Sequence, residues 1–459
     1  MSPRPTRYLA RWLLPVSSPP VRDAAVLVDE TGRIASAGPA VVVPAPDDVR
    51  AIDLGEATLL PGLVNAHAHL ELSFVRGLIE DRPFPDWIAT LLRAKRLTAL
   101  DPTESLAAAR LSCAEAIATG ITTIAATEDS DAGFDAVREA GLRGIVFREV
   151  FGPASDQADA SFAGLLACVD SMRRNESDLV RAGVSPHAPF TVSDPLFERV
   201  ARYAIDESLP VAVHIAESVD ETQFVVHGAG VFADRLRARG IPVEARAVSP
   251  VALLERTGVL RTRPLLIHCV HVDDDDIARI AAAGARVAHC PVANARLGHG
   301  VAPVPAMLAA GLTVGLGSDS VGSNNRIDLL EEARFAQMLQ RAMHGDATLL
   351  PADRLLRMAT LDGARALGLD DRIGTIEPGR DADLCAVRLH GIHVTPVHDP
   401  LSALFYSARA SDVVLTVVKG EILYRDGVVL SLDAAAAVRS VDALAARTRA
   451  ALDSDAGSP

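Results

Sequence analysis

The sequence predicts an α/β protein: a (β/α)8 TIM barrel with a small β-sandwich domain formed from both chain ends. Eight short β-rich runs recur after about residue 59, each followed by a longer stretch rich in Ala, Leu and Arg at helical spacing. No Gly-rich dinucleotide fingerprint follows the first run, which favours a closed barrel over an open doubly wound sheet. The 459 residues, 49% of them hydrophobic, suffice to bury the core of such a domain.

The barrel is assigned to residues 57–369. Its strands are expected at runs separated by helix-compatible segments, in chain order Leu59–Asn65, Ile121–Ala126, Gly144–Val150, Val180–Ser185, Pro210–His214, Pro264–Cys269, Arg286–Cys290 and Val314–Gly317. In barrels of this kind the active site lies at the rim formed by the carboxyl ends of the strands. Functional side chains are therefore sought where each run ends.

Residues 1–56 and 370–440 lie outside this pattern and are expected to form the small β domain. Ala25–Asp29 and Arg33–Ser36 flank a short turn and predict a hairpin. Residues 373–430 contain further short β-rich runs punctuated by Gly and Pro. Because both ends are strand-like, we expect them to pair. Residues 441–459 are expected to be a helix and tail, disordered from Asp453 onward.

Composition limits the partners that the protein can have. The 45 basic and 59 acidic residues give a net charge of −14, which argues against a nucleic-acid partner. Five widely spaced cysteines without a C-x-x-C motif favour a reducing compartment over a disulfide framework or a zinc knuckle. Neither a signal peptide nor an uncharged apolar stretch of about 20 residues is present. We expect a cytoplasmic protein that acts on a small molecule.

Metal-type side chains stand at the ends of four predicted strands. His67 and His69 are two apart, so on an extended strand they project from the same face. His214, His268 and Asp319 end the fifth, sixth and eighth runs. An H-x-H pair or a single buried His is weak evidence by itself. Four separate segments that all end on such residues at one rim predict a metal site.

The ordered set of motifs resembles the amidohydrolase superfamily, in its branch of aromatic-base deaminases and chlorohydrolases, over nearly the whole chain. The matching motifs are Pro61-Gly62 with His67-Ala68-His69, Pro186-His187-Ala188-Pro189, His214-Ile215-Ala216-Glu217, His268, His289-Cys290-Pro291 with Asn294, Gly315–Ser320, and Ile376–Asp383.

The resemblance implies a metal site made of His67, His69, His214 and Asp319. Three imidazoles and one carboxylate suit Zn2+, with Fe2+ as the alternative. Some relatives hold two metals bridged by a lysine on the fourth strand. Here that strand ends Ser185-Pro186. The only two lysines, Lys95 and Lys419, lie elsewhere, so a single metal is expected.

The resemblance also implies three catalytic roles. Asp319 would take the proton of a water activated by the metal. Glu217 would protonate the ring nitrogen beside the attacked carbon and shuttle protons. His268 would stabilise the developing negative charge. The reaction would be hydrolytic displacement of an exocyclic amine as ammonia.

The segment after the first strand resembles the lid of adenosine-type deaminases. Trp87, Arg96, Arg148 and His187 are the predicted substrate contacts, with Arg96 or Arg148 near a carboxylate and His187 near ribose or base. His69–Ser73 resembles aminodeoxyfutalosine deaminases. The leading hypothesis is therefore deamination of 6-amino-6-deoxyfutalosine, a step of menaquinone biosynthesis. Arg96 and its neighbour Arg93 could equally be surface residues of a helix.

Several alternatives remain open from the sequence. The substrate could be S-adenosylhomocysteine or methylthioadenosine, or a guanine- or triazine-type heterocycle handled by an aminohydrolase or chlorohydrolase. A non-enzymatic barrel scaffold would predict lost ligands, and none of the four is missing. A homodimer is an expectation from the family only. The remaining histidines assigned to the surface or to packing are His227, His299, His344, His390, His393 and His398.

Overall fold

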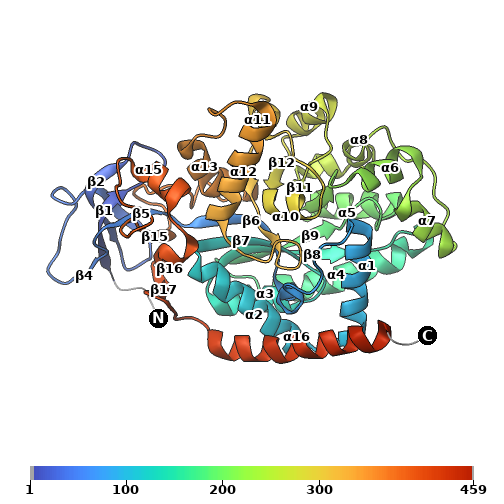
Figure 1. Cartoon of the computed structure of the whole chain (residues 1–459), viewed down its shortest axis with the longest axis horizontal. Helices are drawn as coiled ribbons and strands as arrows, with labels where there is room; N and C mark the ends of the chain where they lie inside the picture. The colour runs from blue at the N-terminus through green and yellow to red at the C-terminus, as the bar shows by residue number, and fades with distance from the viewer. Residues whose placement is uncertain (1–4, 457–459) are drawn as a thin grey trace.

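The computed structural model describes residues 5–456 and places a parallel barrel beside a smaller β domain (Figure 1). One half of the barrel wall has the order β10-β11-β12-β13 and the other β14-β6-β7-β8-β9. A parallel bridge between Val184 and Val211 joins the halves on one side. On the other side β13 contacts β6 and is followed at once in the chain by β14, which pairs with β6. The barrel strands are β6 (Leu63–His69), β7 (Ile121–Glu128), β8 (Arg143–Val150), β9 (Val180–Pro186), β10 (Ala212–Ile215), β11 (Leu265–His268), β12 (Arg286–His289), β13 (Val314–Leu316) and β14 (Asp319–Ser320).

The first predicted barrel strand, Leu59–Asn65, spans two structural elements. Residues Ala57–Pro61 form β5, which pairs with strands of the small domain, and only β6 belongs to the barrel. The expected domain boundary after residue 56 therefore falls five residues too early. Gly62 separates the two strands, and any Cβ there would collide with the side chain of Thr122. Hydrophobicity is continuous across this junction because both strands are buried, so composition gave no sign of it.

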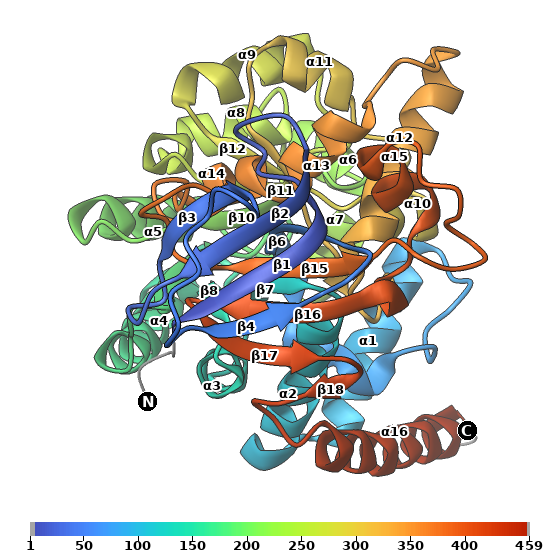
Figure 2. The same cartoon turned by 90° about the vertical axis from the view of Figure 1, so that its left-hand side faces the viewer.

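Both chain ends contribute to the small β domain, as predicted. The strand order is β18-β17-β16-β15-β5-β1-β2-β3, with β4 also paired to β1. Figure 2 shows the blue N-terminal strands lying across the red C-terminal ones. The strands form one connected network through β1 and β5. They are β1 (Thr6–Leu13), β2 (Val21–Val28), β3 (Ile34–Pro39), β4 (Arg50–Asp53), β5, β15 (Leu384–Arg388), β16 (Val413–Val418), β17 (Glu421–Arg425) and β18 (Val428–Val429).

A buried ionic network fastens the barrel to this domain. The guanidinium of Arg143, at the start of β8, donates to Asp383 Oδ2 at 2.7 Å and to Asp381 Oδ2 at 2.9 Å. Arg372 also donates to Asp381, at 2.7 Å. The side chains of Arg143 and both aspartates are 1% exposed. The Arg-Asp-Ala-Asp segment of the C-terminal motif therefore holds the two domains together.

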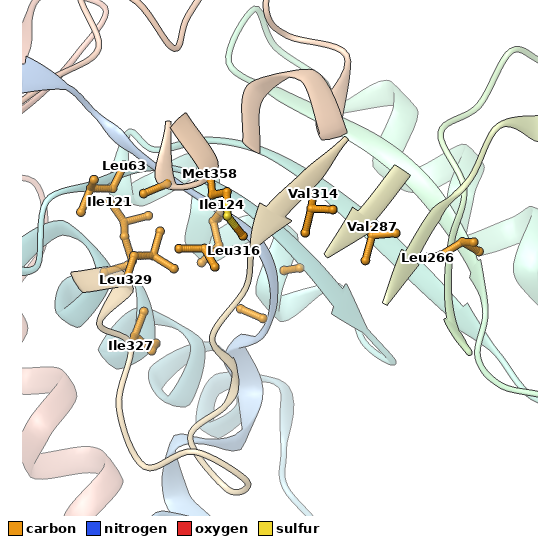
Figure 3. Packing of buried hydrophobic residues seen from close by; sticks show 14 of the residues in the cluster. Leu63, Ile121, Ile124, Leu266, Val287, Val314, Leu316, Ile327, Leu329 and Met358 are labelled. Atoms are coloured by element: carbon orange, nitrogen blue, oxygen red, sulfur yellow. The ribbon is translucent and has the colours of Figure 1, made fainter. Parts of the chain in front are cut away.

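Strand alternation divides the barrel core into two layers. Leu266, Val287 and Val314 are register neighbours on β11, β12 and β13, and Figure 3 shows their side chains in a row. They belong to the large cluster that packs against the outer helices. Residues one position away, including Ile267 and Ala288, belong to the cluster inside the barrel. The interior is therefore filled below the rim.

The helices cover the outside of the barrel and part of its rim (Figure 1). They are α1 (Phe84–Thr98), α2 (Pro102–Ala118), α3 (Ala132–Ala140), α4 (Ala158–Arg174), α5 (Asp194–Asp206), α6 (Val219–His227), α7 (Val231–Ala238), α8 (Pro250–Arg256), α9 (Asp274–Ala283), α10 (Pro291–Arg296), α11 (Val304–Ala309), α12 (Leu329–His344), α13 (Ala352–Ala359), α14 (Leu361–Leu367), α15 (Pro400–Ser402) and α16 (Ala434–Ala456).

The C-terminal helix is longer than expected. α16 begins at Ala434, inside the segment assigned to the β domain, and continues through residues 453–456, which were expected to be disordered. It packs against α1 and α2 along the lower edge of Figure 1, and this packing stabilises its last turns. Residues 457–459 lie outside the described part. No helix within residues 5–456 combines the length and apolar character needed to cross a lipid bilayer. All five cysteines are free.

Candidate active site

The predicted ligands of the metal meet at the carboxyl ends of three barrel strands. His67 and His69 end β6, and Asp319 on the adjacent β14 lies opposite Ala68, between them in register. Asp319 Oδ1 is 3.4 Å from His67 Nε2 and 3.6 Å from His69 Nε2. His214, from β10, places its ring centroid 4.9 Å from that of His67 and 5.3 Å from that of His69. The structure thus brings all four predicted ligands together.

The backbone around these residues is shaped for close approach. Gly317 precedes Asp319, and a Cβ there would lie 2.9 Å from the Cβ of His67, closer than such atoms approach. Asp319 and His268 both have positive φ, 56° and 75°. Non-glycine residues held in this region are strained and concentrate at functional sites. The placement of these two side chains therefore requires a strained backbone at Asp319 and His268.

The donor set fits a divalent metal on the evidence of this structure. His67 is 1% exposed, yet its Nε2 has no hydrogen-bond partner among the described residues. Burial lowers the pKa of His69 to about 3 and also lowers the pKa of His67, so both imidazoles are neutral, the form that binds metals. Burial opposes ionisation of Asp319, but contacts with His67 outweigh it and hold the pKa of Asp319 below its usual value. Three neutral nitrogens and one carboxylate match a zinc site.

Glu217 and His268 lie beside this cluster. His268 Nε2 is 3.5 Å from Glu217 Oε1, and its Nδ1 bonds Asn294 Oδ1 at 2.9 Å. His299, which was assigned to the surface or to packing, lies buried, and its Nε2 is 3.3 Å from the same Glu217 oxygen, a proximity that the sequence reasoning missed. It comes from the loop after α10, so no strand-end pattern marked it. Burial opposes ionisation of Glu217, but the two imidazoles lower its pKa overall.

The carboxyl group of Glu221 fixes the backbone that carries Glu217. It accepts hydrogen bonds from the amides of Ala216 at 2.8 Å and Glu217 at 3.0 Å. Ala216 has a φ of 50°, so this turn needs such support. Burial raises the pKa of Glu221 to about 8.

A cavity of about 340 Å³ opens over the cluster. Its wall is largely apolar and aromatic, with a small number of polar groups at the inner end, as is typical of a small-molecule site. The lining residues are His69, Leu72, Phe84, Trp87, Ile88, Leu91, Leu92, Lys95, Asp129, Glu149, Phe151, Pro153, His187, Phe190, Thr191, His214, Glu217, Arg239, His268, Leu297, Asp319 and Ser320.

Of the four predicted substrate contacts, only Trp87 and His187 line this cavity. Arg96 is exposed and Lys95 takes the cavity-facing position on α1, because a one-residue step turns a helical side chain by about 100°. Arg148 faces outward, with Nη1 3.4 Å from Asp131, while the next residue, Glu149, points into the cavity. In both cases the side chain that lines the cavity belongs to a residue adjacent in sequence to the predicted arginine.

The sequence reasoning missed Lys95, Asp129 and Glu149, which are ionisable residues of the cavity wall. Lys95 pairs with Asp129 at 2.5 Å, and Glu149 lies close to His187 and His214 at 4.0 Å. The alternation of Ile145 and Phe147 into the barrel interior would have placed Glu149 on the same face. For Lys95, the spacing of Trp87 and Leu91 along α1 carried the equivalent signal.

A closed parallel barrel with an imidazole-rich cluster at its carboxyl rim defines a metal-dependent barrel hydrolase. Residues 58–423 match the model of the amidohydrolase family, and the chain belongs to that family. It is accordingly an enzyme that hydrolyses carbon–nitrogen bonds.

Curated relatives match over most of their length. The 5-methylthioadenosine/S-adenosylhomocysteine deaminase of Moorella thermoacetica is 35% identical over 92% of this chain and 94% of its own. The protein of that name from Nitratidesulfovibrio vulgaris strain Miyazaki F is 37% identical over 89% of each chain.

Two solved structures share the fold of this chain and contain zinc. A zinc-bound adenosine deaminase from Xanthomonas campestris has a TM-score of 0.86 and 31% identity over 98% of this chain and 99% of its own. Atrazine chlorohydrolase from Arthrobacter aurescens, also with zinc, has a TM-score of 0.83 and 26% identity over 96% of this chain and 100% of its own. With the donor set described above, the site is a divalent-metal site of zinc type.

Proposed function

We propose that the protein is a hydrolytic deaminase of adenosine-type nucleosides that carry a 5′ substituent, such as methylthioadenosine or S-adenosylhomocysteine. One observation carries the proposal: the four metal-type ligands, Glu217 and His268 converge at the inner end of an aromatic cavity that continues into a second, larger groove. The curated relatives named for this activity support it.

The roles of the chain's own side chains follow from their positions. A bound divalent metal would supply a nucleophilic water at neutral pH. Glu217, which lies within 3.5 Å of two imidazoles, would hold and move the proton between this water, the purine ring nitrogen and the departing amine. His268, oriented by Asn294, would stabilise negative charge at the attacked carbon. A C–O bond forms at C6, the C–N bond breaks, and the amine leaves as ammonia.

The larger groove suits the 5′ substituent. It has a volume of about 760 Å³ and meets the inner cavity at Pro153, Phe190 and Arg239. Arg239 is exposed and makes no side-chain hydrogen bond or ion pair with any other described residue. An unpaired guanidinium at the junction would attract the carboxylate of an amino-acid extension. Asp156 and Glu244 on the groove wall would face its ammonium group.

The cavity wall disfavours 6-amino-6-deoxyfutalosine. Arg96 and Arg148, the two arginines expected to receive its benzoate, do not reach the cavity. The Helicobacter pylori aminofutalosine deaminase shares the fold at 20% identity.

A substrate panel tests the proposal. Zinc-loaded protein is assayed for ammonia release and for the adenine-to-hypoxanthine absorbance change with adenosine, methylthioadenosine, S-adenosylhomocysteine, 6-amino-6-deoxyfutalosine, guanine and a chlorotriazine. We expect turnover of the 5′-substituted adenosines. Arg239→Gln should lower kcat/KM for S-adenosylhomocysteine about fivefold and leave kcat/KM for methylthioadenosine unchanged. The surface control Arg199→Gln should leave kcat/KM unchanged for both substrates. Absence of turnover with every 6-aminopurine nucleoside refutes the proposal.

A further inference from the structure

His299 is a buried histidine to which the proposed chemistry assigns no role. Its side chain is 3% exposed, and its Nε2 lies 3.3 Å from Oε1 of Glu217. This nitrogen makes no aligned hydrogen bond to any residue that the structure describes. A buried polar nitrogen without a partner is costly. Oε1 of Glu217 is close to hydrogen-bonding distance, and the terminal torsion of a Glu side chain turns freely enough to bring the oxygen into line.

The backbone places His299 beside Glu217. The amide of His299 donates to the carbonyl of Asn294 at 2.8 Å, and the preceding residue, Gly298, has a positive φ of 74° that lets the loop turn inward. The side chain of the same Asn294 bonds Nδ1 of His268 at 2.9 Å. One asparagine therefore holds both imidazoles that face the Glu217 carboxyl group.

Phe84, the first residue of the cavity-lining helix α1, packs on the ring of His299. The two ring centroids are 4.4 Å apart and the ring planes are perpendicular, the edge-to-face arrangement that aromatic pairs favour. Phe84 is itself packed edge-to-face against Phe232, at 6.3 Å. An ion pair between Glu80, before α1, and Arg296 ties the same two segments together. The orientation of the His299 ring therefore depends on the helix that covers the cavity.

The neighbouring imidazoles favour the ionised form of Glu217. Burial raises the pKa of Glu221, which bonds backbone amides, to about 8. Burial also opposes ionisation of Glu217, but His268 and His299 outweigh it and lower the pKa of Glu217 below its usual value. An ionised carboxylate only accepts hydrogen bonds, so the His299 nitrogen that faces it must carry a proton and donate.

We propose that His299 is a positioning residue, whose Nε2–H holds the carboxylate of Glu217 in place for proton transfer while Phe84 holds the imidazole. His299 does not line the cavity, so it acts through Glu217 and not on the substrate. This inference rests on the proposed function, in which Glu217 carries the proton, and it adds the residue that orients this carrier.

Two variants of similar size separate the hydrogen bond from packing. His299→Gln keeps an N–H donor, whereas His299→Met fills a similar volume without one. The zinc-loaded proteins are assayed for ammonia release with the nucleoside that wild type deaminates best. His299→Met should lower kcat about 10- to 100-fold, the range for a hydrogen bond to a charged group, and leave KM within about threefold of wild type. His299→Gln should keep kcat within about threefold of wild type.

Phe84→Leu tests the contact that orients the ring. In the wild-type background it should lower kcat about two- to tenfold, as expected for loss of an edge-to-face pair. In the His299→Met background it should cause no further fall in kcat, because the imidazole that Phe84 holds is already gone. Additive losses would show that Phe84 acts independently of His299 and would refute this contact's role.

The tautomer of His299 gives a readout other than turnover. In zinc-loaded protein labelled with ¹⁵N-histidine, the side-chain signals that disappear in His299→Gln belong to His299. We expect these signals to show a protonated Nε2. An unprotonated Nε2 would overturn the inference, because the ring could then not donate to Glu217.

Controls separate positioning from other roles. His344→Met replaces an exposed histidine at the end of α12 and should leave kcat and KM unchanged. Zinc content of His299→Met should match wild type, and loss of zinc would mean that His299 supports the metal site instead. Equal losses of kcat in His299→Met and His299→Gln would show that ring packing matters and not the N–H group. Either result would overturn the inference, as would a loss confined to KM.

The two proposals fail in different ways. If wild type deaminates nucleosides and His299→Met retains wild-type kcat, the positioning role is refuted and the proposed function stands. If wild type turns over guanine or the chlorotriazine but no 6-aminopurine nucleoside, the proposed function is refuted, and the same variants decide the role of His299 on that substrate. If wild type turns over no substrate of the panel, both are refuted.

Discussion

Replacement of Glu217 by Gln tests the role of Glu217 in proton transfer, because Gln has nearly the same shape but does not gain and release a proton as a carboxylate does. The amide oxygen of Gln can take the place of Oε1 of Glu217, which lies 3.5 Å from Nε2 of His268 and 3.3 Å from Nε2 of His299. The backbone amide of residue 217 keeps its bond to Glu221. The substitution therefore leaves shape and hydrogen bonding in place and removes only a group that gains and releases a proton at neutral pH.

The expected loss is that of a general acid–base catalyst. Such groups contribute about 10²- to 10⁴-fold, so kcat should fall by that factor, or about 3–5 kcal/mol in activation free energy. KM should change little, because the contact is used in the transition state more than in substrate binding. Steady-state ammonia release, with zinc content and circular dichroism measured on the same samples, checks this.

A matched control is Glu207→Gln, which removes a surface carboxylate paired with Arg173. It should retain wild-type kcat. Activity of Glu217→Gln within about threefold of wild type would refute the role of Glu217 as the proton carrier. Loss of zinc in that variant would show that the side chain acts on the metal site instead.

Three further predictions concern stability and metal. Arg143→Met should lower the free energy of unfolding by about 3–5 kcal/mol in urea titrations, because it strands two buried aspartates, whereas the exposed Arg138→Met should cost under about 0.5 kcal/mol; equal effects would contradict the network's role. Removal of zinc by a chelator should abolish turnover and lower Tm, and zinc at 100 times its Kd should restore about 2.7 kcal/mol; unchanged activity after complete removal would exclude a catalytic metal. Burial raises the pKa of Glu221 to about 8, above about 4.3 in the unfolded chain, so the folded state binds a proton that the unfolded state releases and stability falls as pH rises through this window. Glu221→Gln should show a shallower decline than wild type between about pH 5 and 8 at fixed zinc, and parallel curves would contradict the assignment.

Residues whose positions depend on local pattern were predictable from the sequence. His67 and His69 share a strand face because side chains alternate, and the ends of parallel strands meet at one rim, so His214, His268 and Asp319 could be expected near them. The hairpin of the N-terminal segment followed from its turn and its alternation. These features need only the period of the element and the topology of the barrel.

Some roles depend on which face of a strand or helix a side chain occupies, or on contacts between segments far apart in the sequence. Those roles were not predictable in this way. A one-residue difference decides whether Arg148 or Glu149 enters the cavity, and likewise Arg96 or Lys95, because adjacent side chains point to different faces of a strand or helix. His299 reaches Glu217 only because a rim loop folds inward.

The sequence by itself determined the barrel, the small β domain, the metal-type ligands and the single-metal expectation, since these follow from periodic hydrophobicity and from motifs within continuous segments. The tertiary structure decided the walls of the cavity. It set Glu149 beside His187, neutralised Lys95 with Asp129 and left Arg239 unpaired at the groove. Charge and hydrogen-bond partnership between side chains from separate elements depend on distances that only the packed chain defines.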